Sequence, residues 1–148
     1  MKRFFIAAFL LLTLLVAGCK VENKKILVFE HGEVGPKTWL SLEVQGNRIL
    51  NRVYLTKGSY SDLGVGDKNE AEALYSVPPA GLKDIKGFEL SYDFTEEGFV
   101  RELVIDHTTI SPDDLNLIVD RVGVWYGDNV DLPNLIMKLE QVGFVRLE

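Results

Sequence analysis

The stretch Phe88-Glu89-Leu90-Ser91-Tyr92-Asp93-Phe94-Thr95 alternates large apolar and polar side chains without a break. A period of two is typical of a β-strand with one buried face. Residues with turn chemistry follow at Glu96-Glu97-Gly98, and Phe99 to Asp106 then returns with apolar and charged residues interleaved. The two runs predict an antiparallel hairpin. Its register is fixed by the apolar face, because a slip of one residue would turn every side chain to the other face.

The residues before this hairpin predict a meander of further strands. Ile26-Leu27-Val28-Phe29 is a short apolar run, Thr38 to Val44 alternates, and Arg48 to Thr56 is rich in Ile, Val, Tyr and Thr. Gln45-Gly46-Asn47 separates two of these runs and has the composition of a hairpin turn. The C-terminal segment Phe144 to Glu148 predicts one more strand.

Three helices are predicted from the chemistry of their first turns. Asp67 with Glu70 has the spacing of a capping box, Ser111-Pro112 places a cap before a proline at the first helical position, and Asp131 caps a third helix. Pro78-Pro79 ends the first helix by Val77, and Ala80 to Lys86 has room for one more helical turn. The inner faces predicted from helical spacing are Ala71, Leu74 and Tyr75, then Leu115, Ile118 and Val119, and finally Leu132, Leu135, Ile136, Leu139 and Val142, with Gly143 at the last helix end.

The N-terminus has the pattern of an export signal. Met1-Lys2-Arg3 precedes an apolar run that is shorter than the roughly 20 residues a membrane span needs, and small residues follow it. Val16-Ala17-Gly18-Cys19 resembles the bacterial lipobox, whose Cys becomes the lipidated first residue of the mature protein. We therefore predict a signal peptide at 1–18, a lipidated Cys19 (carrying acyl groups such as palmitate) with a tether at 19–25, and one α+β domain at 26–148, with its sheet packed against about three helices.

Charge and cysteine content narrow the classes of partner. Removal of residues 1–18 takes Lys2 and Arg3, which leaves 14 basic against 22 acidic residues and a net charge near −8. Such a balance disfavours nucleic acid and anionic lipid as partners, because both need clustered Lys or Arg. Cys19 is the single cysteine, so no disulfide forms within the chain and the hydrophobic core alone must stabilise an exported domain.

Several segments, in this order, resemble the YehR-type family of small bacterial lipoproteins, which is defined by a domain of unknown function. They are Gly46-Asn47 before a strand, Thr56 before the capped helix, Lys83-Asp84-Ile85-Lys86-Gly87 before a strand ending in Tyr92, Val104-Ile105-Asp106, and Val142-Gly143-Phe144 at the final helix. The resemblance implies an α+β domain tethered to an envelope membrane. It implies no activity, catalytic residue or cofactor.

The sequence leaves two alternatives open, a catalytic or metal centre at the histidines and a cation site before the last helix. His31 and His107, with Asp106, are the residues on which an envelope hydrolase or a metal-dependent enzyme would centre, although two histidines fall short of the three or four ligands of a transition-metal site. Asp128, Asn129 and Asp131 are the best oxygen ligands for a cation, but they lack the spacing of a calcium loop, and helix capping accounts for Asp131.

Aromatic residues offer a surface for binding. We expect Trp39, which alternates with Leu40, to lie in the core, whereas Trp125 and Tyr126 beside Gly127 are predicted to be partly exposed and to form a binding surface. Taken together, these features predict a non-enzymatic, membrane-anchored envelope lipoprotein that presents an acidic domain to a small ligand or a protein partner. Lys20 after Cys19 resembles an outer-membrane sorting signal, with the domain on the periplasmic face, where the source has two membranes.

Replacement of Cys19 tests the anchor. Cys19→Ala should accumulate as an unlipidated precursor, because no thiol is left to accept the acyl groups. Detergent phase partitioning measures this directly: the wild-type protein enters the detergent phase and the variant stays in the aqueous phase or remains uncleaved. Normal partitioning of the variant would contradict the prediction.

Overall fold

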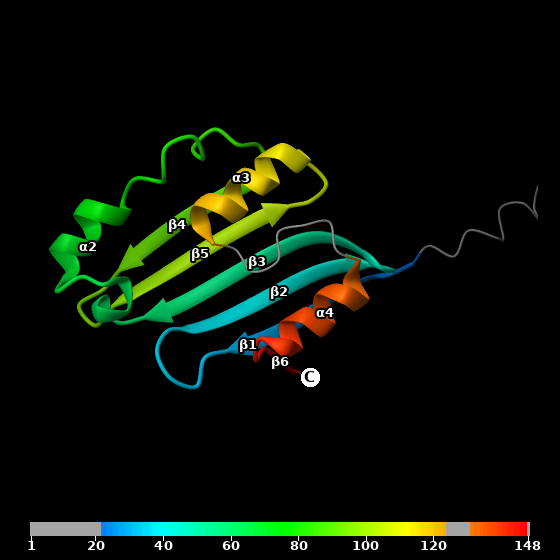
Figure 1. Cartoon of the computed structure of the whole chain (residues 1–148), viewed down its shortest axis with the longest axis horizontal. Coiled ribbons are helices and arrows are strands. Elements are labelled where there is room, and N and C mark those ends of the chain that lie inside the picture. Colours follow the sequence, from blue (N-terminus) through cyan, green and yellow to red (C-terminus); the bar gives the residue numbers. More distant parts are fainter. Residues whose placement is uncertain (1–21, 124–130, 148) are drawn as a thin grey trace, which may run out of the picture.

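A computed structural model describes residues 22–123 and 131–147 of the chain (Figure 1). The predicted α+β class is confirmed, with one sheet and helices in a single domain. The elements in chain order are β1 (Lys24–His31), β2 (Lys37–Gln45), β3 (Arg48–Gly58), the 3-10 turn η1 (Tyr60–Leu63), α2 (Lys68–Tyr75), β4 (Phe88–Phe94), β5 (Phe99–Asp106), α3 (Pro112–Val122), α4 (Leu132–Gln141) and β6 (Val145–Leu147).

The six strands form one sheet in the order β4-β5-β3-β2-β1-β6, and each neighbouring pair is antiparallel. The predicted hairpin is confirmed as β4 and β5, with Phe94 opposite Phe99 and Leu90 opposite Leu103. The predicted meander is β1, β2 and β3. Its last strand, β3, pairs on its other side with β5, so the two predicted units join into one sheet.

Helices α3 and α4 lie on one face of this sheet, and no helix of the described residues lies on the opposite face (Figure 1). The core fills the layer between the sheet and the two helices. Its fully buried side chains include Phe29, Leu40, Leu42, Leu103, Ile105, Ile118, Leu135 and Leu139. Alternate residues of β1 to β5 therefore face the core, and those between them form the bare face, whereas all three residues of β6 are exposed.

The three predicted helix caps are confirmed by hydrogen bonds. Asp67 accepts from the Glu70 amide at 3.0 Å, Ser111 from the Asp114 amide at 3.1 Å, and Asp131 from the Asn134 amide at 3.1 Å. At residues 22–123 and 131–147, no helix is both long enough and apolar enough to pass through a bilayer.

Four local predictions differ from the structure. Leu74 was predicted to face inward but is 61% exposed, because α2 is short and only Ala71 of its apolar residues is buried. The segment Ala80 to Lys86 forms turns instead of a helical turn, since Gly81 adopts a left-handed φ of 88°. Strand β1 begins at Lys24, inside the predicted tether, and η1 was not predicted.

Gly98 closes the β4–β5 hairpin against the neighbouring strand. The Thr95 amide donates to the Gly98 carbonyl at 2.8 Å, and a Cβ at Gly98 would lie only 2.2 Å from the Gly58 carbonyl oxygen. No side chain fits this approach, so Gly98 allows the turn to pack on the end of β3.

The packing of α4 gives a matched pair of substitutions. Leu139 is fully buried and Met137, two residues earlier, is 49% exposed. Leu139→Ala should lower the free energy of unfolding by about 2–5 kcal/mol through lost burial and a residual cavity, whereas Met137→Ala should change it by less than about 0.5 kcal/mol. Urea denaturation of both variants measures the difference, and equal effects would contradict this placement of α4.

Candidate functional site

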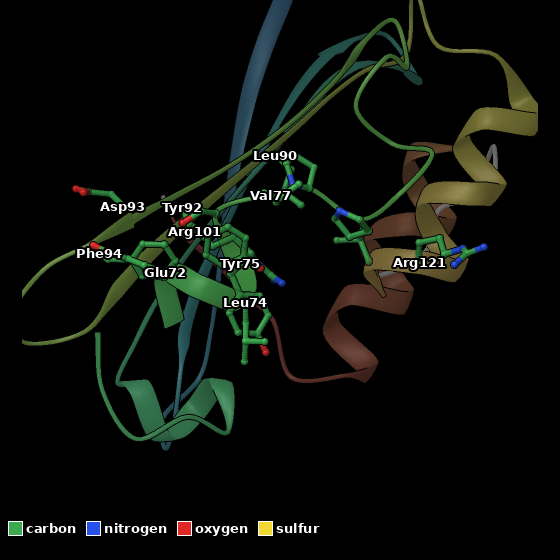
Figure 2. Close-up of a pocket in the computed structure, with 14 residues that line it drawn as sticks. Glu72, Leu74, Tyr75, Val77, Leu90, Tyr92, Asp93, Phe94, Arg101 and Arg121 are labelled. Carbon is green, nitrogen blue, oxygen red and sulfur yellow. The ribbon is translucent and has the colours of Figure 1, made fainter. Parts of the chain in front are cut away.

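A pocket of about 620 Å³ opens on the helix-covered side of the sheet, between α2 and α3 (Figure 2). This volume falls in the range of small-molecule sites. Strands β4 and β5 form one wall, and the segment from Ser76 to Pro79 forms another. The lining residues are Glu72, Leu74, Tyr75, Ser76, Val77, Pro78, Pro79, Leu90, Tyr92, Asp93, Phe94, Arg101, Arg121 and Val122.

Aromatic rings pack together at the α2 end of the pocket. The Tyr92 ring lies 5.5 Å from that of Tyr75 and stacks on Phe94 at 5.7 Å with an interplanar angle of 7°. Tyr92 and Phe94 reach the same face because the alternation of β4 sends every second side chain there. The sequence pattern that fixes the hairpin therefore also builds the aromatic part of the site.

Arg101 supplies the positive charge next to these rings. It pairs in register with Tyr92 on one side and Thr56 on the other, so all three side chains share one face of the sheet. One terminal nitrogen of its guanidinium lies 3.5 Å from the Thr56 hydroxyl, whereas its Nε is buried without a hydrogen-bond partner in the described residues. Among these residues no carboxylate forms an ion pair with Arg101. The guanidinium thus keeps capacity for an anion.

The rim of the pocket is apolar where α2 ends. Leu74 is 61% exposed and Val77 is 75% exposed, and the close-up places both beside the cavity (Figure 2). Arg121 lies on the far side, on α3, while Asp93 points away from the rings. A ligand in this pocket would meet aromatic and aliphatic surface together with a guanidinium.

The two histidines do not come together, which overturns the enzyme hypothesis centred on them. His31 pairs with Thr38, which pairs with Thr56, so His31 lies three strands away from β5, about 14 Å. Arg101 is the β5 residue at this level, and His107 is six residues farther along, about 20 Å. No single metal or proton relay can use both side chains. In the part of the chain that the structure describes, no group of three His, Cys, Asp or Glu could hold a metal.

Each histidine has a packing environment of its own. The His31 ring lies 4.9 Å from the Phe144 ring, against the end of α4. His107 follows β5, and burial together with the nearby positive charge of Arg52 lowers its pKa to about 4. Asp106 accepts hydrogen bonds from the Thr108 and Thr109 hydroxyls at 2.6 and 2.7 Å, and these bonds lower its pKa. Asp106 therefore acts as a turn-forming residue here.

Of the remaining predicted site residues, one is a helix cap and the others lie outside the described part of the chain. Asp131 is the cap of α4, as expected. Its proposed partners in a cation site, Asp128 and Asn129, lie outside the described residues, and so do Cys19 and the predicted binding surface at Trp125 and Tyr126.

The prediction that Trp39 is a core residue is wrong. Its register with Leu55 and Glu30 places it on the bare face, because Leu40 takes the inward position. The Trp39 indole N–H donates to Glu30 Oε2 at 2.8 Å, and the Lys37 and Lys57 ammonium groups lie 5.2 and 5.8 Å from the ring centroid. Lys37 also forms a 2.8 Å ion pair with Glu30 and thereby lowers the pKa of that carboxyl. The polar and charged groups around Trp39 are therefore partnered with one another on the bare face.

The sequence analysis missed two inward-facing arginines. Arg101 has the same parity as Phe99 and Leu103 along β5, and Arg52 has the same parity as Tyr54 along β3. Arg52 is only 1% exposed and Tyr54 is 3% exposed. The sequence does contain a signal for both residues, because each arginine occupies an inward position of an alternating strand. The alternation alone had assigned them to the polar face.

The family assignment follows from a match over most of the domain. A sequence model of the family described as a protein of unknown function, DUF1307, matches residues 27–144. The chain belongs to this family. The resemblance to YehR-type lipoproteins is thereby confirmed, and the family description names no activity.

Relatives and solved structures agree with this assignment. An uncharacterized lipoprotein of Listeria monocytogenes serovar 1/2a is 27% identical over 105 residues, which cover 71% of this chain and 67% of that protein. One of Listeria innocua serovar 6a is 24% identical over 69% of this chain and 65% of its own length. The NMR structure of the E. coli YehR protein has a TM-score of 0.70 at 18% identity over 85% of this chain and 92% of its own. That of a Streptococcus pneumoniae TIGR4 protein reaches 0.58 at 13% identity over 84% of each chain. These structures share the fold.

His107 makes stability depend on pH in a defined window. Its pKa is about 4 in the folded protein and 6.5 in the unfolded chain, so below pH 6.5 only the unfolded state gains the proton. The free energy of unfolding should fall by about 1–2 kcal/mol between pH 6.5 and pH 4, after allowance for solvent screening of the partly exposed ring. His107→Gln should remove this part of the pH dependence in urea titrations. A variant with the wild-type slope would contradict it.

Proposed function

We propose that this chain is a non-catalytic, lipid-anchored binding module of the bacterial cell envelope, and that its ligand site is the pocket between α2 and α3. The observation that carries the proposal is the guanidinium of Arg101, which lines an aromatic pocket without a carboxylate partner among the described residues. The ligand would carry an anionic group and an apolar part.

Two observations support the anchor. Val16-Ala17-Gly18-Cys19 resembles a lipobox at the end of a signal peptide, and both Listeria relatives are named as lipoproteins. Two acyl chains on Cys19 would hold the domain stably, because a single chain gives only marginal membrane binding. Residues 20–23 would then separate the lipid from β1, and so short a tether would keep the domain close to the membrane surface.

The surroundings of Arg101 favour an anionic ligand over a neutral one. A partly buried guanidinium loses hydration, and a carboxylate or phosphate restores charge-assisted hydrogen bonds that Thr56 supplies only weakly at 3.5 Å. Tyr75, Tyr92 and the exposed Leu74 would cover the apolar part of the ligand.

The role we infer requires only binding. A general acid or base must lie within hydrogen-bond reach of the reacting group, and the titratable groups at the pocket are Glu72, Tyr75, Tyr92, Asp93 and the two arginines. Neither histidine lines the cavity. Recognition and retention at the membrane are therefore the proposed activity.

Thermal unfolding with a ligand panel tests the site. The purified lipidated protein in detergent would be heated with divalent metals, cell-wall fragments and soluble lipid head groups. A ligand at about 100 times its Kd stabilises the folded state by roughly 2.7 kcal/mol and should raise Tm by several degrees. We expect anionic cell-wall fragments to produce the shift and divalent metals to produce none.

The matched variants are Arg101→Gln and Arg48→Gln. Each removes one positive charge, but Arg48 is exposed at the start of β3 and does not line the pocket. Arg101→Gln should reduce the ligand-induced shift to about half or less, because the loss of a charge-assisted bond costs about 1.5–3 kcal/mol, while Arg48→Gln should keep the full shift. A shift of wild-type size in Arg101→Gln would overturn the placement of the site.

A further inference from the structure

We propose that the occupant of this pocket is an extended peptide segment that carries a carboxylate and adds to the sheet as a strand beside β4. This inference rests on the proposed function and names the ligand class of the same site. The inference combines two features of the structure: the free edge of strand β4 and the guanidinium of Arg101.

The direction of the backbone groups of β4 follows from hydrogen bonds at both ends of the hairpin. The Thr95 amide donates to Gly98 at one end, and the Asp106 amide donates to Gly87 at the other, both at 2.8 Å. Hydrogen-bonded pairs alternate along an antiparallel ladder, so Glu89, Ser91 and Asp93 direct their backbone groups toward β5. The residues between them must direct their N–H and C=O groups away from the sheet.

Those outward residues are Leu90, Tyr92 and Phe94, and their side chains line the pocket. Strand β4 is the last strand of the sheet at this edge. Within the described residues no backbone hydrogen bond joins Leu90, Tyr92 or Phe94 to a segment outside the hairpin. One row of residues thus offers free main-chain donors and acceptors at the edge and apolar side chains on the face, which are the two requirements of strand addition.

The neighbouring segment of the chain leaves this edge open. Only Phe88, the first residue of β4, donates to this segment, at 3.4 Å from the Ile85 carbonyl. Farther along, Pro78 and Pro79 line the same cavity as β4 and have no N–H to donate. Close packing of this segment on the edge would have left no cavity between them.

Arg101 sets the chemistry of the added segment. A strand placed beside β4 would lie two strand spacings from β5, about 10 Å. The side chains of an arginine and a glutamate together span this gap when they share a face. Arg101 faces the pocket at the level of Tyr92, so a carboxylate of the peptide opposite Tyr92 would reach it. The carboxylate is either an acidic side chain or the C-terminus of the peptide.

The test uses a library of random hexapeptides with acetylated N-termini, in a free-acid set and a C-terminally amidated set. They are screened by fluorescence polarisation against the lipidated protein in detergent. Binders should contain a carboxylate. Binding confined to the free-acid set identifies the C-terminus as its source, and acidic binders in both sets identify the side chain. If no peptide binds below 1 mM, the peptide proposal is overturned. Thermal unfolding with small anions tests separately whether the pocket binds a ligand at all.

Two measurements on the best binder then test strand addition itself. Methylation of successive peptide nitrogens should weaken binding about tenfold at every second position and by less than about twofold at the positions between. Amide hydrogen exchange should show Leu90, Tyr92 and Phe94 fast in the free protein and protected in the complex, with Glu89, Ser91 and Asp93 protected in both. Binding without this alternation would overturn strand addition and leave the pocket in place.

Three variants distinguish the effect of the Arg101 charge on peptide binding from an effect on folding. Arg101→Gln should weaken binding at least tenfold, Arg101→Lys should retain part of it, and Arg48→Gln should bind as the wild type does. Protection of Glu89, Ser91 and Asp93 in each variant reports that the hairpin is intact. Equal affinity of Arg101→Gln and the wild type for an acidic peptide would overturn the role of Arg101.

Discussion

The structure of residues 22–123 and 131–147 depends on the fact that their helices cover only one face of the sheet. Side-chain parity then decides whether a strand residue is in the core or on the bare face. Strand β3 lies between β2 and β5, and its Tyr54 pairs with Leu40 on one side and Leu103 on the other, all three buried. If β3 slipped by one residue, Val53 or Leu55 would take the place of Tyr54 between Leu40 and Leu103, and the polar side chains of β3 would turn toward the core. A single register of β3 therefore suits its pairing with β2 and with β5 at once.

The same parity places two arginines in the covered layer. Arg52 lies near the sheet centre at 1% exposure, where its charge adds to the effect of burial in lowering the pKa of His107, and Arg101 lies at the pocket. Burial of a guanidinium is costly unless it is paired. Arg101 has no carboxylate partner among the described residues, and its Nε is buried without a hydrogen-bond partner. For this reason we assign Arg101 to a ligand and look for the occupant on the same face.

Local patterns were sufficient to predict the strands, the hairpin and the helix caps from the sequence, because each depends on residues close in the chain. Asp67, Ser111 and Asp131 bond to amides three residues away. Trp39 and Leu74 were misplaced, since the choice of inward face for β2 and the distance of α2 from the core are set by tertiary packing. The pocket combines Tyr75, Tyr92 and Arg121 from three elements, and no spacing in the sequence brings these together.

The position of the pocket relative to the proposed anchor follows from the strand order. The chain enters the sheet at Lys24, seven residues before His31, whose level across the sheet is that of Arg101 and Tyr92. Seven residues along a strand and four strand spacings across it give about 23 and 19 Å, hence roughly 30 Å between them. Figure 1 places the start of β1 and helix α2 at opposite ends of the molecule. A lipid on Cys19 would therefore fix one corner of the sheet at the membrane and leave the β4 edge at the opposite corner, where an extended segment of another protein can approach without meeting the bilayer.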